Sequence, residues 1–306
     1  MKRYQDIPGD GGSDVPGQVE AHQARLKRRM AAVRHKVTIL SGKGGVGKST
    51  VTANLAVALA RAGQRVAVLD ADLNGPSMAT LLGVRGMRPV LCEGGVLPAV
   101  GPLGVKVVSM DLFLAGDDTP LTWQGPSQTE AYLWRGSMEV NALREFLSDV
   151  EWGALDFLLL DLPPGSDRMA NLAGLLPDLS GGIVVTIPTG LSHLVVRKAI
   201  ALAREVLKTP LIGLLENMAP GPCPRCGEAS GFPGGADSAS VAEAVGIPFL
   251  GRVPFDPRLA SAADRGLPLV LAHPEAPAAA ALGQLAADVR AYVEWRAAEA
   301  PARGEG

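Results

Sequence analysis

The sequence predicts an α/β fold in which helices cover both faces of a doubly wound, mainly parallel sheet. Short apolar runs alternate with helix-period segments along most of the 306 residues, and this alternation is typical of that fold class. Most of the runs are apolar on both faces, as strands must be when helices cover a sheet from both sides. A glycine-rich segment, 42–49, joins the first run to the first helix and fits the pattern of a phosphate-binding loop. The predicted class is therefore a P-loop NTPase.

The elements follow from these runs in chain order. Strands are expected at 36–41, 65–70, 105–110, 155–161, 182–187, 210–216 and 247–251. Helices are expected at 49–62, 137–149, 192–208, 237–245, 257–264 and 276–298. There is no sign of an internal repeat or a second domain. We expect one P-loop ATPase domain over 35–300, with a cysteine-bearing metal loop near 219–235.

The first 34 residues have a different composition. They are polar, punctuated by glycine and proline, and basic toward their end. Such a segment cannot bury much apolar surface, so it is predicted to be a mobile extension with a short surface helix rather than a binding arm.

Charge and composition exclude several classes of protein. The net charge of −2, from 29 basic and 31 acidic residues, gives no electrostatic reason to expect a nucleic acid or an anionic membrane as partner. No apolar run is long enough to span a bilayer, and the N-terminus does not resemble a secretory signal. Three cysteines do not make a disulfide framework. We therefore expect a cytoplasmic protein.

The phosphate loop is the strongest local signal. Segment 42–49 fits G-x-x-x-x-G-K-[ST] where a strand gives way to a helix, which disfavours a glycine-rich turn that binds nothing. Lys48 should reach the β- and γ-phosphates of ATP, and the Ser49 hydroxyl should ligate Mg²⁺. Glycines let the backbone N–H groups turn toward the phosphates above the helix N-terminus. The expected nucleotide-binding residues are Gly42, Lys43, Gly44, Gly45, Val46, Gly47, Lys48, Ser49 and Thr50.

Lys43 is a second lysine inside the loop that the basic pattern does not require. A flexible cation there cannot easily fold back onto its own nucleotide and is better placed to reach a phosphate held by a neighbouring subunit. Chemistry alone leaves this role and that of a solvated surface lysine equally open.

Two acidic segments follow predicted strands. Asp70 and Asp72 come after the second strand, and Asp72 is a candidate to orient the attacking water. Asp161 closes an apolar run in the Walker-B arrangement, where a carboxylate can hold the hydration shell of Mg²⁺. Gly165 ends the adjacent Pro-Pro-Gly loop, and its N–H can approach a γ-phosphate. Lys43, Lys48 and Asp72 are thus the candidate catalytic residues.

These motifs resemble a known family. GKGGVGKST is similar to the signature of the deviant-Walker-A ATPases, and DADLNGPS, DLPPG, ENM and VPFDP resemble the Mrp/ApbC-type iron–sulfur cluster carriers over about residues 35–270. The resemblance implies that Lys43 acts across a nucleotide-sandwich dimer, that Asn217 contacts adenine, and that Pro254 and Asp256 lie beside the base. The residues after DLPPG, Ser166-Asp167-Arg168, depart from the family pattern.

A cysteine pair, Cys223 and Cys226, has C-x-x-C spacing in a loop rich in proline and glycine. This setting favours metal binding over redox chemistry, because redox dithiols usually start a helix. Two thiolates cannot complete a tetrahedral zinc site or a four-cysteine cluster, and Cys92 is far away in sequence. The missing ligands are expected from a second chain by symmetry. In the family that the chain resembles, this motif holds a bridging 4Fe–4S cluster, although a structural zinc suits the same thiolates.

Together these features predict an ATP-binding and ATP-hydrolysing carrier that holds a 4Fe–4S cluster between the two subunits of a homodimer. It would transfer the cluster to apo iron–sulfur proteins, with slow hydrolysis of Mg²⁺-bound ATP coupled to transfer. A positioning or partition ATPase, or the same fold with a bridging zinc, remains an alternative.

Overall fold

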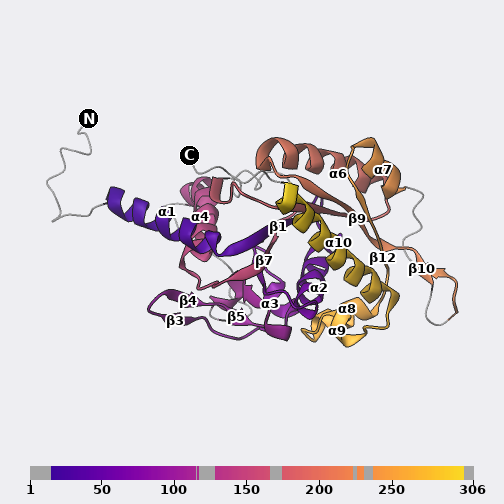
Figure 1. Cartoon of the computed structure of the whole chain (residues 1–306), viewed down its shortest axis with the longest axis horizontal. Coiled ribbons are helices and arrows are strands. Elements are labelled where there is room, and N and C mark those ends of the chain that lie inside the picture. Colours follow the sequence, from indigo (N-terminus) through magenta and orange to yellow (C-terminus); the bar gives the residue numbers. More distant parts are fainter. Residues whose placement is uncertain are drawn as a thin grey trace.

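The computed structural model describes residues 15–114, 116, 128–165, 174–222, 226–230 and 237–299. Its centre is an eight-stranded sheet with the strand order β12-β9-β8-β1-β7-β2-β6-β5 (Figure 1). All neighbouring pairs in it are parallel except β5 with β6. The mainly parallel sheet that the sequence predicts is confirmed. The strands are β1 (Val33–Ser41), β2 (Val66–Asp70), β5 (Ala99–Val100), β6 (Lys106–Val108), β7 (Leu155–Asp161), β8 (Gly181–Thr186), β9 (Leu211–Ala219) and β12 (Phe249–Pro254).

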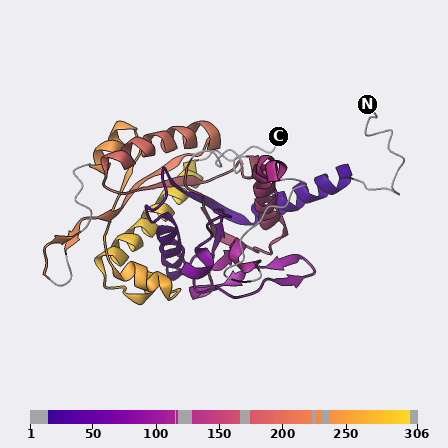
Figure 2. The same ribbon diagram turned by 180° about the vertical axis from the view of Figure 1, so that it is seen from behind.

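Helices cover the sheet on both faces, with a separate apolar core on each. One face packs against α2 (Lys48–Arg61), α3 (Met78–Leu81), α9 (Leu269–Ala272) and α10 (Pro277–Glu299). The other packs against α1 (Val15–Ala31), α4 (Gln128–Asp149), α6 (Gly190–Leu202) and α7 (Ser238–Ala244). In Figure 1, α4, α6 and α7 lie above the strands, and α2, α3 and α8 (Arg258–Asp264) lie below them; Figure 2 shows the same arrangement from behind.

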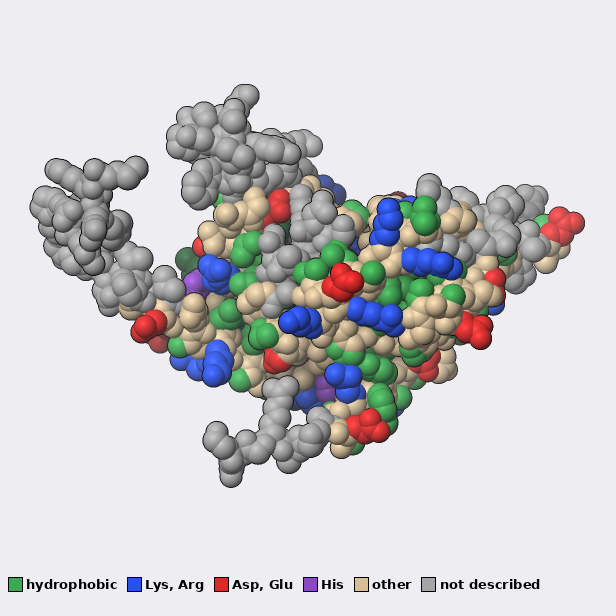
Figure 3. Space-filling model, turned by 90° about the horizontal axis from the view of Figure 1, so that it is seen from above, with side chains coloured by type: hydrophobic (Ala, Val, Ile, Leu, Met, Phe, Trp, Pro, Cys, Tyr) green, Lys and Arg blue, Asp and Glu red, His purple; other side chains and the backbone are tan. Residues whose placement is uncertain are grey.

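The central strands show why this arrangement forms. Every residue of β2 and β8 is buried. In β1, Val37 and Ile39 contribute to the core beneath α2, whereas Leu40 contributes to the opposite core. Strands that are apolar on both faces require helices on both sides. Figure 3 shows Lys and Arg side chains beside Asp and Glu side chains on the described part of the face above α6 and α7, in keeping with a net charge near zero.

Some element boundaries differ from those that the sequence predicts. Strand β6 ends at Val108 rather than at residue 110, because the backbone turns into a 3₁₀ helix at Met110–Leu112. Between them, the Ser109 hydroxyl donates to Asp70 Oδ2 over 3.1 Å. Helix α6 continues as a π-helical turn, Ala203–Leu207. Two short hairpins were not expected. They are β3–β4 (Val90–Cys92 and Gly95–Leu97) and β10–β11 (Gly221–Pro222 and Ala229–Ser230).

The N-terminal extension also differs in part from expectation. A short surface helix was expected here. Residues 15–31 instead form a helix of 17 residues, α1, and this helix packs on α4. Arg25 pairs with Asp149 at 2.8 Å, and Arg29 contacts both carboxylate oxygens of Glu151. The first strand, β1, starts at Val33, and residues 1–14 lie outside the described part. None of the helices in the described ranges is both long and apolar enough to cross a membrane.

Candidate functional site

The phosphate loop connects the end of β1 to the start of α2, as its sequence predicts. Gly45 and Gly47 have φ angles of 77° and 79°, in the left-handed region that disfavours side chains. A Cβ at Gly42 would lie 2.8 Å from Val195 of α6, and one at Gly47 would collide with the Asn217 amide. Glycine is therefore required at Gly42 and Gly47 by close approach and at Gly45 by backbone conformation.

Three side chains of α2 meet the Walker-B carboxylate at the C-terminal end of the sheet. Asp161 is fully buried, and its Oδ2 lies 2.8 Å from Lys48 Nζ and accepts from Ser49 Oγ at 2.6 Å. Its Oδ1 accepts from Thr52 Oγ1 at 2.7 Å. Thr52 is one helical turn beyond Lys48, so both side chains lie on one side of α2. These contacts place the loop lysine, the candidate Mg²⁺ ligand and the carboxylate within one cluster.

A second buried carboxylate adjoins this cluster. Asp70 ends β2 directly opposite Asp161 in β7 and has no exposed surface. Its Oδ2 accepts from the backbone N–H groups of Ser77 and Met78 at 2.8 and 3.0 Å. Burial, followed by the charge of Asp161, raises the pKa of Asp70 to about 7, against the opposing effect of the backbone N–H groups. Asp70 thus fixes the loop that comes after β2, and Asp72 lies in that loop.

A cavity of about 220 Å³ lies above the phosphate loop. Lys43 and Asp72 line it together with loop residues and Pro164, so the predicted catalytic side chains do converge on one space. Gly165 has a φ angle of 92°, and its N–H lies 3.4 Å from the carbonyl oxygen of Ser41, which keeps the Pro-Pro-Gly segment against the loop. The full lining is Ser41, Lys43, Gly44, Gly45, Val46, Gly47, Lys48, Ser49, Thr50, Asp72 and Pro164.

The donor set of this cavity fits Mg²⁺ bound to a nucleotide. Two buried carboxylates, Asp70 and Asp161, face one buried ammonium group, Lys48, which leaves an excess of negative charge. Mg²⁺ is a hard cation that binds carboxylate and hydroxyl oxygens together with phosphate oxygens. Ser49 Oγ and Asp161 are the residues that would hold it, directly or through water. Bound Mg²⁺ would neutralise phosphate charge, while Lys48 would turn to the β- and γ-phosphates.

A narrower, mostly apolar slot of about 170 Å³ adjoins the phosphate cavity, and both are lined by Gly47 and Thr50. This continuity gives the shape that a nucleotide needs, with phosphates at one end and a base at the other. Asn217, Pro254 and Asp256, which the family resemblance placed near adenine, all line the slot. The full lining is Gly47, Thr50, Asn217, Met218, Pro254, Phe255, Asp256, Pro257, Leu259 and Ala260.

Two polar residues of the slot already have partners in the chain. The Asn217 amide donates to the carbonyl oxygen of Val46 at 2.9 Å, so it ties the base end to the phosphate loop. The Asp256 carboxylate pairs with the Arg258 guanidinium at 2.7 Å, and the hydrogen bonds from Arg258 hold the pKa of Asp256 below its usual value. Asp256 therefore fixes the wall of the slot, while its contact with adenine stays a prediction.

The cysteine pair is only partly described. Cys226 is exposed in the connection between β10 and β11, and Cys223 lies outside the described residues. Cys92 is exposed in β3, near the opposite edge of the main sheet from β9 and β12 (Figure 1). Among the residues that the structure describes, no three His, Cys, Asp or Glu side chains are grouped to hold a metal ion.

Sequence reasoning missed four residues that the structure places at this site. Thr52 could have been found from its four-residue spacing from Lys48 on one helix. Asp70 was recognised only as a neighbour of Asp72. Met218 and Phe255 line the base slot; both stand in the ENM and VPFDP motifs, but the sequence analysis gave neither a role.

Comparisons with known proteins agree with this geometry. The family model described as NUBPL iron-transfer P-loop NTPase matches residues 32–132 and 127–290. An "Iron-sulfur cluster carrier protein" of Saccharolobus solfataricus is 41% identical over 264 residues, which cover 86% of this chain and 85% of that protein. The human "Cytosolic Fe-S cluster assembly factor NUBP2" is 37% identical over 84% of this chain and 92% of its own length.

Solved structures extend the comparison. A nucleotide-binding protein of Archaeoglobus fulgidus in complex with ADP superposes with a TM-score of 0.67 at 35% identity, covering 80% of this chain and 91% of that one. The cell-division ATPase MinD of Pyrococcus furiosus superposes with a TM-score of 0.56 at 22% identity and 84% coverage of this chain, or 98% of its own. At that identity the second comparison shows a shared fold alone.

Proposed function

Because this chain belongs to the NUBPL iron-transfer P-loop NTPase family, we propose that it is an ATP-dependent carrier of iron–sulfur clusters. In this proposal a homodimer binds a 4Fe–4S cluster through Cys223 and Cys226 of both subunits and delivers it to apo iron–sulfur proteins in the cytoplasm. Relatives named as cluster carriers and as a cytosolic assembly factor support the cargo and the location.

The ATPase half of the proposal is supported by the phosphate cavity and the base slot. Lys48, Ser49 and Asp161 form the Mg²⁺–phosphate cluster, and Asp72 lines the space where an attacking water would stand. General-base or water-orienting carboxylates in phosphoryl transfer act at such positions. Lys43 lines the same cavity from the loop. We propose that it reaches the phosphate of the facing subunit, so that hydrolysis depends on the dimer.

The proposal that the protein carries an iron–sulfur cluster is supported by the number of cysteine ligands that each chain offers. Cys226 is exposed, and the described part of the chain offers no completed metal site around it. A 4Fe–4S cluster takes four thiolates, whereas each chain contributes one C-x-x-C pair. Two chains related by a two-fold axis supply four ligands at one point.

One contact carries the link between the two halves. A Cβ at Gly221, the first residue of the cysteine hairpin, would lie 2.9 Å from the Cβ of Pro254, which lines the base slot. Phe255, which follows Pro254 in the slot wall, donates its N–H to the carbonyl oxygen of Ala219, just before the hairpin, at 2.8 Å. The base of the cysteine hairpin thus packs directly on the wall of the nucleotide site. We propose that nucleotide turnover shifts this wall and thereby adjusts the cysteine hairpin during cluster release.

Anaerobic reconstitution with iron and sulfide tests the function. We expect about four irons per dimer and a broad brown absorbance. Cys223→Ala or Cys226→Ala should abolish the absorbance, because the symmetric site loses two ligands at once, whereas the matched Cys92→Ala change should leave it intact. ATP binding should survive all three changes. A cluster that persists in the Cys223→Ala, Cys226→Ala double variant would refute the proposal, and one zinc per dimer without iron uptake would favour the structural-zinc alternative.

A further inference from the structure

Helix α4 carries a carboxylate on the side that it turns toward the core. Glu139 is only 5% exposed and stands one helical turn before Leu143, which is buried together with Leu147. An apolar side chain would be expected at such a position, because burial of a carboxylate is costly unless it is paired or hydrogen-bonded. Glu139 Oε1 accepts from the Asn74 side-chain amide at 2.9 Å. The buried acid therefore joins α4 to the loop that follows β2.

This loop contains a β-turn at residues 72–75. Within it, a backbone bond of 3.2 Å joins the N–H of the fourth residue to the carbonyl oxygen of Asp72. Asn74 is the third residue of the turn, so its bond to Glu139 ties the middle of the loop to α4. Asp70 holds the two ends of the loop through backbone N–H groups. The turn is thus held by two buried carboxylates, one from β2 and one from α4.

The Asp72 carboxylate depends on the turn for its direction. Within the described part of the chain, no hydrogen bond or ion pair holds that carboxylate itself. A Cβ at Gly75 would lie 3.7 Å from Asp72 Oδ2, so the carboxylate lies over the turn. Burial of Leu73 seats the turn on the core. Any rotation of the turn would therefore move the carboxylate within the phosphate cavity that it lines.

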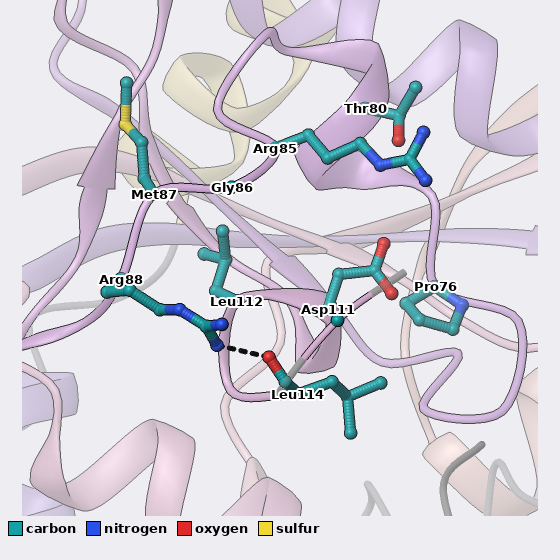
Figure 4. A pocket seen from close by; sticks show the side chains of 10 residues that line it. Pro76, Thr80, Arg85, Gly86, Met87, Arg88, Asp111, Leu112 and Leu114 are labelled. Atoms are coloured by element: carbon teal, nitrogen blue, oxygen red, sulfur yellow. Dashed lines mark hydrogen bonds between the residues drawn. The ribbon is translucent and has the colours of Figure 1, made fainter. Parts of the chain in front are cut away.

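Open space flanks the loop on two sides. Asp72 lines the phosphate cavity, and Pro76 lines a separate hollow of about 260 Å³ together with Asp111 (Figure 4). Packing on these two sides therefore does not fix the orientation of the loop, and the hydrogen bonds to its backbone and to Asn74 do so instead.

We propose that Glu139 is a positioning residue for ATP hydrolysis, which through Asn74 holds the turn that directs Asp72 toward the attacking water. In hydrolysis the water oxygen bonds to the γ-phosphorus as the bond from that phosphorus to the bridging oxygen of ADP breaks. The water protons pass to the phosphate product and to solvent. Neither Glu139 nor Asn74 lines the phosphate cavity or the base slot. The inference rests on the proposed water-orienting role of Asp72.

Single-turnover ATP hydrolysis by the full-length chain, with ATP affinity measured by calorimetry, tests the inference. Glu139→Ala and Asn74→Ala should each slow hydrolysis at least tenfold, because a small displacement of a reacting group lowers the rate steeply. ATP affinity should stay within about twofold of the wild type, since the phosphate loop is unchanged. Glu139→Gln keeps an oxygen that can accept from Asn74 and should restore most of the rate. Asn74 is exposed, so its variant decides the matter if Glu139→Ala does not fold.

Two readouts separate positioning from a merely structural role. In an Asp72→Ala background, Glu139→Ala should slow hydrolysis no further, because residues that act as one unit are not additive. Amide hydrogen exchange of residues 72–75 in the nucleotide-free chain should be faster in Glu139→Ala, with exchange in β2 and β7 unchanged. Glu145→Ala is the matched control. Glu145 is exposed on the same helix, and its variant should match the wild type in rate and exchange.

Wild-type hydrolysis in both Glu139→Ala and Asn74→Ala would overturn the inference. So would a further loss of rate in the Asp72→Ala background, which would show that Glu139 acts without Asp72. A loss of ATP affinity as large as the loss of rate would also overturn it. A wild-type rate in Asp72→Ala alone would instead refute the proposed role of Asp72, and the inference with it. Iron uptake tests the carrier proposal separately.

Discussion

Replacing Asp70 by asparagine should remove a pH dependence of stability that the nucleotide-free protein carries between pH 5 and pH 8. The Asp70 carboxyl is buried opposite Asp161, and its pKa in the fold is about 7, compared with 3.8 for an ordinary aspartate. Between those two pKa values the folded chain keeps a proton that the unfolded chain has lost. Stability therefore falls as the pH rises through this range, and the loss is complete only above pH 7.

The size of the effect follows from the two pKa values. Each unit of pKa difference corresponds to about 1.4 kcal/mol. Above pH 7 the raised pKa of Asp70 therefore lowers the free energy of unfolding of the wild type by at most about 4 kcal/mol, relative to acid pH. About 3 kcal/mol of this develops between pH 5 and pH 8. The asparagine amide does not titrate, so Asp70→Asn should lack this slope. The variant should also lose an accepted hydrogen bond, such as the one from the Asp72 N–H, at a cost of about 1–2 kcal/mol at every pH.

Urea unfolding in EDTA at pH 5, 6, 7 and 8 measures the slope of stability against pH without nucleotide or Mg²⁺. Asp156→Asn is the matched control. Hydrogen bonds from Arg65 lower the pKa of Asp156 to about 2. Asp156 therefore changes the stability of the fold with pH only below about pH 4, outside the measured range. The control should keep the wild-type slope. Parallel pH profiles for wild type and Asp70→Asn would refute the reasoning, because they would show that Asp70 holds no extra proton in the fold.

Four further changes test the nucleotide site. Lys48→Ala should weaken Mg²⁺–ATP binding at least tenfold, or by about 1.4 kcal/mol, and unchanged affinity by calorimetry would contradict the assignment. Lys43→Ala should retain ATP binding but lose single-turnover hydrolysis; hydrolysis at the wild-type rate would remove its role across the dimer. Asp72→Ala should bind ATP and turn it over much more slowly, as measured in the same single-turnover assay, and a wild-type rate would argue against a water-orienting carboxylate. Gly47→Ala should lower ATP affinity at least tenfold, because the new Cβ would collide with the Asn217 amide at a left-handed backbone position; wild-type affinity would mean that the loop can relax.

The sheet and the phosphate loop could be predicted because their signals are local. Two-sided apolar runs such as β7 need only the neighbouring residues to be recognised, and the loop follows from the spacing of its glycines and Lys48. The predicted strand ends also brought Asp72 and Asp161 to the same edge of the sheet. Residues that close parallel strands can be grouped from sequence alone, since all such strands end at one edge.

Contacts between distant segments could not be predicted in this way. Helix α1 packs on α4 through apolar contacts of Leu26 and Met30 and through ion pairs of Arg25 and Arg29 with Asp149 and Glu151, more than 110 residues away. A basic, weakly apolar segment has the same composition whether or not such partners exist, so it was predicted to be mobile. The bond from Asn217 to Val46 likewise joins residues that no local pattern relates.

The same limit explains why the charge balance of the site emerged only from the structure. Each of Asp70, Asp161 and Lys48 has an ordinary local interpretation, as a strand-end acid or a loop lysine. Their joint burial leaves two carboxylates against one ammonium group in a space from which water is largely excluded. Such an excess can be met by a proton, as the raised pKa of Asp70 indicates, or by a divalent cation. Mg²⁺–nucleotide and the Asp70 proton should therefore compete, so that Mg²⁺–ATP stabilises the fold more at pH 8 than at pH 6.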